Sequence, residues 1–363
     1  MYRVEAISKI AVVIVIFSSV VARSKSLEER KDGNSRFSKR STFCPSNTQC
    51  VPLTSCPILS NLIDNDCILS NSIGDLGCGY QGSGLVCCPQ TGEPTTLLPT
   101  ASDGTRCGVS QVQGDGYEGI GAYPWLARVG FRNVLTGEVK YPCTGSIISN
   151  RIILTAAHCA LAKADNFKLF SVRLGEWKTN TDIDCGEEFC GLPPQDIGVS
   201  HVIVHPGYQK QTYRNNIALL VTKSRMNYTV TTQPICLPES WSVTSNNALL
   251  VGWGKAARQT YAPPLQQILK LPIISIQECV RVYGRTLPIS EEQVCAGGEP
   301  GNDACSGFGG APLLVRHGDM HYQVGILSFG SDQCGAPGVP SVYTNVKKYI
   351  TWIRENIPQV YDN

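Results

Sequence analysis

Short apolar runs recur along the chain from residue 107 onward. They cover residues 145–148, 151–155, 199–204, 217–221, 248–252 and 324–329, are rich in Ile, Val and Leu, and are separated by Gly, Pro and Asn. Runs of this length between turn residues are typical of the strands of a β-sandwich or β-barrel. The pattern therefore predicts one large all-β domain of about 250 residues.

The end of the chain has a different periodicity. Val346, Tyr349, Ile350 and Ile353 recur at intervals of three and four residues, which places them on one face of a helix. We therefore expect a helix over residues 346–356 that closes the domain.

The N-terminus has the pattern of a signal peptide. Arg3 and Lys9 precede an apolar run over residues 10–21, and the small residue Ala22 follows it. The run is shorter than the roughly 20 apolar residues that a membrane-spanning helix needs. We therefore expect residues 1–22 to be a signal peptide, and no membrane anchor.

Three segments separate the signal peptide from the β-domain. Residues 23–43 are polar and charged, and we interpret them as a disordered pro-segment. Residues 44–88 contain seven cysteines and too few apolar residues to fold without disulfides. Residues 89–111 are rich in Pro, Thr and Gly, as in a linker. The β-domain would then occupy residues 112–357.

Composition excludes several classes of partner and ligand. The chain has 31 Lys and Arg against 29 Asp and Glu and no block of like charge, so we expect neither nucleic acid nor a membrane surface as a partner. Its 17 cysteines fit an oxidising compartment, and zinc is the weaker interpretation because no pair of C-x-x-C motifs occurs and the chain has only 5 histidines. We expect disulfides, no metal and no cofactor. The sequon at Asn227 is a candidate glycosylation site.

Eight motifs occur in order along the β-domain: Tyr123-Pro124-Trp125, Thr155-Ala156-Ala157-His158-Cys159, Asn216-Ile217-Ala218-Leu219-Leu220, Pro234-Ile235-Cys236-Leu237-Pro238, Gly252-Trp253-Gly254, Cys295-Ala296-Gly297, residues 303–313, and Val342-Tyr343-Thr344-Asn345-Val346. Together they resemble the chymotrypsin-fold serine proteases over almost the whole domain. The resemblance implies an all-β fold, with a double six-stranded β-barrel and a C-terminal helix, preceded by a small disulfide-rich module.

The resemblance also identifies the positions of the catalytic triad. Proteases of this family use a Ser nucleophile, a His general base and a buried carboxylate. His158 is present, but Asn216 stands at the carboxylate position and Gly309 at the nucleophile position. Loss of the carboxylate alone lowers the rate about 10⁴-fold, and loss of the nucleophile lowers it on the order of 10⁶-fold. We therefore expect a protein that is not an enzyme.

The activation switch and the specificity pocket of the family are altered as well. Phe308 replaces the Asp that receives the new N-terminal amine after zymogen cleavage, and Gln111 replaces the basic residue before the first residue of the activated chain, here Val112. Asp303 matches the family's selector for basic residues, whereas Ser341 replaces a glycine of the pocket wall. A hydroxymethyl group there would narrow the slot, so we interpret the pocket as a remnant.

Two other side chains could support residual chemistry. Ser306 precedes Gly309 by three residues, but in the family this side chain lines the entrance and does not reach the histidine. His158, without a serine or carboxylate partner, is interpreted as a packed, hydrogen-bonded remnant beside a disulfide and not as a metal ligand.

The cysteines follow the same resemblance. Cys107 and the nine cysteines of the β-domain are implied to form the disulfides Cys107–Cys236, Cys143–Cys159, Cys185–Cys190, Cys279–Cys295 and Cys305–Cys334. Residues 44–88, with adjacent Cys87 and Cys88, resemble a clip domain of the arthropod clip-domain proteases, which implies the bridges Cys44–Cys87, Cys50–Cys78 and Cys56–Cys88. Cys67 is then left for an intermolecular bridge, a cap or a buried thiol, unless it takes the place of Cys78.

The sequence offers few sites for processing. No Lys or Arg occurs between residues 41 and 105, so a trypsin-like activator could cut this half of the chain only after Arg40 or Arg106. Cleavage after Arg106 would separate the N-terminal module from the β-domain unless Cys67 or other contacts held it.

These resemblances define an expected function. The protein would be a secreted, non-catalytic clip-domain serine protease homologue of haemolymph or venom, with prophenoloxidase or clip-domain proteases as partners and self-association as a further option. It would act as a cofactor of prophenoloxidase activation and melanization, which belongs to innate immunity. The alternatives are a decoy that inhibits melanization, and a residual trypsin-like hydrolase that uses Ser306 or water with His158.

Overall fold

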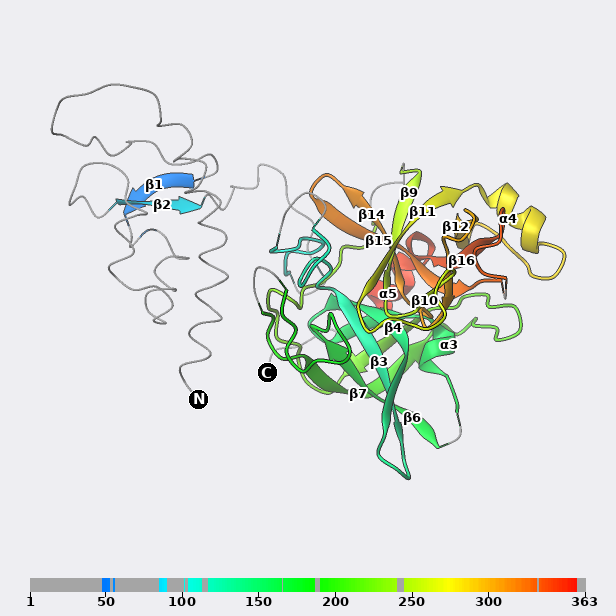
Figure 1. The fold of residues 1–363 in the computed structure, drawn as a ribbon, viewed down its shortest axis with the longest axis horizontal. Coiled ribbons are helices and arrows are strands. Elements are labelled where there is room, and N and C mark those ends of the chain that lie inside the picture. The colour runs from blue at the N-terminus through cyan, green and yellow to red at the C-terminus, as the bar shows by residue number, and fades with distance from the viewer. Residues whose placement is uncertain are drawn as a thin grey trace, which may run out of the picture. The chain divides into compact units, whose positions relative to one another are not determined.

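The computed structural model describes residues 48–52, 55, 85–89, 101, 104–112, 117–164, 166–186, 190–239, 245–331 and 333–357 (Figure 1). A pair of N-terminal strands belongs to one compact unit and two β-barrels belong to another. The signal peptide, the pro-segment and Arg40 lie outside the described residues.

The N-terminal unit contains one antiparallel ladder. Strand β1 (Thr48–Pro52) pairs with β2 (Leu85–Pro89), so that Cys50 lies opposite Cys87 and Gln49 opposite Cys88 along the backbone. The bridges predicted for this module depend on residues or side chains outside the described set: Cys44, Cys50, Cys56, Cys67, Cys78, Cys87 and Cys88. These pairings stay predictions.

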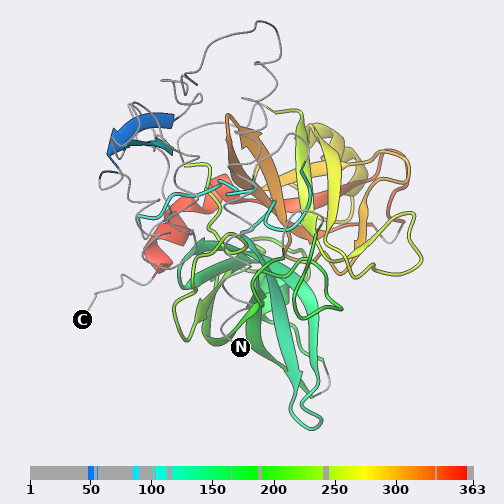
Figure 2. The ribbon, with the colours of Figure 1, turned by 60° about the vertical axis from the view of Figure 1, so that its left-hand side comes forward.

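The β-domain begins with a closed six-stranded antiparallel barrel, coloured cyan to green in Figures 1 and 2. Its strands are β3 (Leu126–Asn133), β4 (Val139–Ser149), β5 (Ile152–Thr155), β6 (Phe167–Leu174), β7 (Gln195–Val204) and β8 (Ala218–Thr222), in the order β3-β4-β5-β8-β7-β6. Every residue of β5 and β8 is buried, and these strands contribute Leu154 and Leu219 to the main hydrophobic cluster.

A second closed six-stranded barrel follows. Its strands are β9 (Asn247–Gly252), β11 (Gln267–Ile274), β12 (Gln293–Gly297), β14 (Pro312–His317), β15 (Met320–Phe329) and β16 (Pro340–Asn345), in the order β11-β12-β16-β15-β14-β9. A short ladder joins β10 (Lys255–Ala256) to β13 (Ala304–Ser306). The predicted double barrel is confirmed.

One hydrophobic core connects the two barrels. Its main cluster extends from Leu154 and Leu219 of the first barrel to Leu314 and Ile326 of the second. A buried hydrogen bond from the Ser146 hydroxyl to the Gln323 side chain also joins them. The barrels therefore pack as one domain, and residues near the interface are held from both sides.

The helices are few and short. The predicted C-terminal helix is present as a 3₁₀ turn, η3 (Val346–Tyr349), followed by α5 (Ile350–Asn356), and its four periodic apolar residues are all buried. Helix α4 (Ile276–Tyr283) was not predicted, although Ser275 and Glu278 form a capping box, a pattern that the sequence displays. No helix in the described ranges is long and apolar enough to cross a membrane.

The last part of the segment predicted as a linker is fixed to the β-domain. Cys107 is buried and forms a disulfide with Cys236. The backbone N–H of Gly108 donates to the Pro234 carbonyl, and the Gly108 carbonyl accepts from the N–H of His321, both at 2.8 Å. Gly108 has a φ of 69° and leaves no room for a Cβ beside the His321 carbonyl. The Cys107–Cys236 disulfide therefore attaches the end of this segment to the β-domain, although its composition is that of a linker.

Candidate functional site

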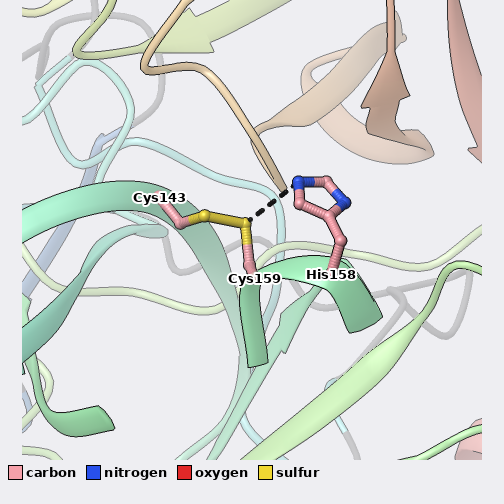
Figure 3. A group of neighbouring side chains, drawn as sticks. All are labelled: Cys143, His158 and Cys159. Carbon is pink, nitrogen blue, oxygen red and sulfur yellow. Dashed lines mark hydrogen bonds between the residues drawn. A yellow bond between two sulfur atoms is a disulfide. The ribbon is translucent and has the colours of Figure 1, made fainter. Parts of the chain in front are cut away.

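The histidine of the triad position lies in a single turn of helix, α3 (Ala157–Ala160), directly after β5. The Cys143–Cys159 disulfide ties this turn to β4, and both Ala157 and Cys159 are fully buried. These contacts fix the backbone that carries His158. Its Nε2 lies 3.4 Å from the Cys159 sulfur (Figure 3).

Three side chains at this corner bring metal-type donors within 4.8 Å of one another: Cys143, His158 and Cys159. The two sulfur atoms are joined in a disulfide, as the yellow bond in Figure 3 shows. A cysteine binds a metal ion as a thiolate, and a disulfide provides none. The donor set of this cluster therefore does not fit a metal ion.

Asn216 is fully buried before β8 and contacts His158 twice. Its Oδ1 accepts a hydrogen bond from the His158 backbone N–H at 3.0 Å, and its Nδ2 lies 2.9 Å from His158 Nδ1 and 2.7 Å from the Ser328 hydroxyl. A backbone N–H can only donate, so the amide oxygen must face it and the amide NH₂ must face the ring. Nδ1 of His158 is therefore an acceptor, and the ring proton is on Nε2.

Burial, the largest cause, lowers the pKa of His158. The ring is therefore neutral at physiological pH. A general base for a serine at residue 309 would need a lone pair on Nε2 and a proton on Nδ1, which a carboxylate at residue 216 would favour. The amide of Asn216 selects the opposite tautomer.

Gly309 faces the histidine with backbone only. A Cβ at this residue would lie 3.0 Å from His158 Nε2, 3.3 Å from the Cys159 sulfur and 3.4 Å from the Cys143 sulfur. The Gly309 carbonyl accepts from the Thr144 N–H at 2.9 Å, which holds the loop against the first barrel. The edge of the imidazole thus borders a position that has no side-chain atom.

Phe308 is 1% exposed and belongs to the hydrophobic cluster of the second barrel. Its ring packs on the backbone at the end of β9, where a Cβ on Gly252 would lie 3.1 Å from the ring and one on Gly254 would overlap it. At the residue that the resemblance matches to the family's ionised aspartate, this chain therefore has an apolar side chain that fills its site.

Val112, at the first position of the family's activated chain, packs elsewhere. Its backbone N–H donates to the Ser110 hydroxyl at 3.1 Å, and its carbonyl accepts from the same hydroxyl at 2.8 Å. A Cβ on Gly121 would lie 2.8 Å from Val112 Cγ2. The two residues that the resemblance assigns to the family's switch thus have separate local environments, Val112 beside Gly121 and Phe308 beside Gly254.

The pocket residues Asp303 and Ser341 bind each other. Asp303 is 2% exposed and Ser341 1%, and the Ser341 hydroxyl donates to Asp303 Oδ1 at 2.8 Å, as does the Ala304 N–H. Burial raises the pKa of Asp303, and these hydrogen bonds lower it by smaller amounts. The serine was predicted to narrow the pocket. Its direct bond to the selector carboxylate was not foreseen, although the two residue types made it available.

The other predicted site residues lie on the surface of the β-domain. Ser306 is exposed on β13, Arg106 is exposed beside buried Cys107, and Asn227 is exposed next to Gln195, whose side chain accepts from the Asn227 N–H at 3.0 Å. The β-domain contains five disulfides, the same pairs that the resemblance implies: Cys107–Cys236, Cys143–Cys159, Cys185–Cys190, Cys279–Cys295 and Cys305–Cys334.

Comparison with known proteins agrees with this architecture. The family model named Trypsin matches residues 112–353. The chain belongs to the trypsin family, and within it to the clip-domain serine proteases and their homologues.

Three relatives illustrate the relationship. The CLIP domain-containing serine protease B4 of Anopheles gambiae is 36% identical over 77% of this chain and 80% of its own length. Phenoloxidase-activating factor 3 of Holotrichia diomphalia is 34% identical over 85% of this chain and 90% of its own. Phenoloxidase-activating enzyme 1 of Spodoptera litura is 34% identical over 86% and 91%.

Proposed function

We propose that this protein is a secreted, non-catalytic clip-domain serine protease homologue that acts by binding proteins of a phenoloxidase-activating cascade. The observation that carries the proposal is the geometry at Gly309. The position of the nucleophile has no side chain, and the histidine beside it holds its proton on the nitrogen that would have to accept one. Neither change alone would leave an efficient protease.

The preserved frame supports a binding role. Both barrels are closed, and five disulfides constrain the chain around them. Each disulfide typically stabilises a fold by about 2–4 kcal/mol, so the frame is stable without any catalytic contact. A stable domain offers a fixed surface to a partner, which a cofactor needs and a degraded relic would lack.

The names of the relatives support the choice of cascade. They include phenoloxidase-activating factors and a phenoloxidase-activating enzyme, and the match extends over most of each chain. In this proposal residues 1–22 direct secretion, residues 44–88 form the clip domain, and prophenoloxidase or its activating protease is the partner. Arg106, exposed beside the anchored Cys107, is the processing site in the described part of the chain.

The test is phenoloxidase activity in a mixture of purified prophenoloxidase and its activating protease, with and without this protein. The protein is added intact and after cleavage, and an Arg106→Gln variant is the matched control. A cofactor raises phenoloxidase activity after cleavage, and Arg106→Gln removes the increase. A dose-dependent decrease in activity would instead identify a decoy, and equal activity in all mixtures would contradict a role at this step.

A further inference from the structure

The β3–β4 hairpin and strand β6 form an open groove of about 590 Å³ on the first barrel. The hairpin extends beyond the rest of this barrel in Figure 1. Both its turn and the outer end of β6 line the groove, with Arg132, Val134, Leu135, Lys168 and Phe170 as the side chains that define its chemistry. We call this surface the hairpin groove.

The apolar side chains of the hairpin groove are unusually exposed. Leu135 is 76% exposed, Val134 55% and Phe170 42%. The turn that presents them is held in place, because Asn133 Oδ1 accepts from the N–H groups of Leu135 at 2.9 Å and Thr136 at 3.1 Å. The Val134 N–H donates to the Asn166 carbonyl at 2.8 Å. A partner would therefore meet a fixed apolar surface and lose little entropy in ordering it.

Two cations, Arg132 and Lys168, lie beside these apolar side chains. Arg132 and Lys168 are directly paired across β3 and β6, an arrangement in which like charges repel. No acidic residue in the described part of the chain is within ion-pair distance of either, whereas nearby Lys140 lies 3.4 Å from Glu138. The Arg132 guanidinium is 5.0 Å from the centre of the Phe170 ring. A carboxylate of a ligand would relieve the repulsion between Arg132 and Lys168. An apolar side chain next to that carboxylate would contact the Phe170 ring.

We propose that the hairpin groove binds an extended segment of a partner protein that carries carboxylates next to aliphatic or aromatic side chains. The carboxylates pair with Arg132 and Lys168, and the apolar side chains cover Leu135 and Phe170. The volume of the groove suits a few residues of such a segment. An anionic membrane is a poorer match, because juxtamembrane recognition uses clusters of about 4–8 basic residues and this groove has two.

This inference rests on the proposed function in one respect, namely that the protein acts by binding a partner. It assigns the hairpin groove as the surface that binds. The test uses the full-length protein and a fluorescein-labelled ten-residue peptide that alternates Glu with Leu and Phe. Its control is the same peptide with Gln in place of every Glu. Binding is measured by fluorescence anisotropy at low and at physiological salt, because the contribution of the charges weakens as salt rises.

We expect saturable binding of the Glu peptide. The double variant Arg132→Glu/Lys168→Glu and the single variant Leu135→Asp should each weaken it about tenfold or more. Leu135→Met should bind like the natural protein, and Lys210→Glu/Arg281→Glu, which reverses two exposed cations elsewhere, should change the affinity less than about twofold. The melting temperature of each variant shows whether the fold is intact.

Three results would overturn the proposal: no saturable binding of the Glu peptide, equal affinity for the Gln peptide, or full affinity in folded groove variants. Sedimentation with phosphatidylserine–phosphatidylcholine vesicles that Leu135→Asp abolishes would assign the surface to a membrane instead. The same preparations are tested for labelling by a serine-directed reagent. Labelling with intact peptide binding would refute the non-catalytic function and leave the groove, whereas the opposite result would refute the groove alone.

Discussion

The histidine corner of the first barrel and the loop 303–310 of the second barrel have changed in different ways. At the corner, His158, Asn216 and the Cys143–Cys159 disulfide still form a closed set of contacts, and the amide of Asn216 makes three hydrogen bonds. In the loop, Phe308 is buried in an apolar cluster and Asp303 is bound to a serine of the pocket wall.

The contacts around residue 216 are kept although its side chain is an amide, whereas the surroundings of residue 308 are apolar. The corner keeps its shape because the backbone N–H of His158 and the hydroxyl of Ser328 need only a polar side chain at residue 216, and an amide satisfies them as well as a carboxylate. The loop could not keep an ionised aspartate at residue 308 without a buried cation to pair it. We propose that the apolar packing of Phe308 takes the place of the charge pair that the family resemblance implies at this position.

The largest effect is expected from Phe308→Asp. This variant removes a buried ring and places a carboxylate among apolar side chains, which should lower the free energy of unfolding by about 4 kcal/mol. Phe308→Leu, the matched control, keeps most of the volume and should lower it by about 1.5 kcal/mol. Guanidinium denaturation at pH 7 measures both. Equal stability of the two variants would mean that a cation reaches residue 308 and that a working switch survives.

A smaller loss is expected from Ser341→Ala. The variant removes a hydrogen bond to a buried carboxylate and should lower the free energy of unfolding by about 2 kcal/mol at pH 7. Ser328→Ala removes a hydroxyl that accepts from the neutral amide of Asn216 and should lower it by about 1 kcal/mol. If Ser341→Ala proved as stable as the natural protein, water would be replacing the serine and the pocket would be open.

The ionisation of Asp303 should make stability depend on pH in a defined direction. Burial raises the pKa of Asp303 in the folded protein above its unfolded value of about 3.9. The folded state then binds its proton more tightly, so this contribution to stability is complete below pH 4 and is lost as pH rises through the raised pKa. Asp303→Asn should therefore gain stability relative to the natural protein between pH 3.5 and pH 7.

Denaturation midpoints of the two proteins across this range test the sign. A constant difference in stability would mean that Asp303 titrates alike in the folded and the unfolded chain.

The protonation of His158 can be measured directly, without a measurement of stability. In the natural protein the Nε2–H tautomer follows from the amide of Asn216, and Asn216→Asp should transfer the proton to Nδ1 and raise the pKa of His158. Nitrogen-15 chemical shifts of the imidazole distinguish the two tautomers. The Nδ1–H form in the unsubstituted protein would overturn the orientation assigned to the Asn216 amide.

The sequence was sufficient to predict the double-barrel frame of the molecule. The apolar runs mark strands because each is bounded by turn residues, and the spacing of Val346, Tyr349, Ile350 and Ile353 marks a helix because their side chains share one face. The assignment of Asn216 and Gly309 to the carboxylate and nucleophile positions comes from the family resemblance and stays a prediction, whereas the side chains themselves are given by the sequence.

Contacts between residues far apart in the chain could not be predicted from these sequence patterns. The tautomer of His158 depends on the orientation of one amide, and the tight fit of Phe308 depends on two glycines more than fifty residues earlier in the chain. The hairpin groove was also missed, because exposure of Val134 and Leu135 follows from an Asn133 turn and not from hydrophobic periodicity. The capping box of α4, in contrast, has a signal in the sequence, Ser275 followed by Glu278.

The most direct test of the central claim is the reaction of the natural protein, intact and cleaved, with a fluorophosphonate that labels activated serines, followed by mass spectrometry. The double variant Gly309→Ser/Asn216→Asp and an active trypsin are treated in parallel. We expect no adduct on the natural protein and stoichiometric labelling of trypsin. A stoichiometric adduct on any serine of the natural protein, Ser306 included, would contradict a non-catalytic function.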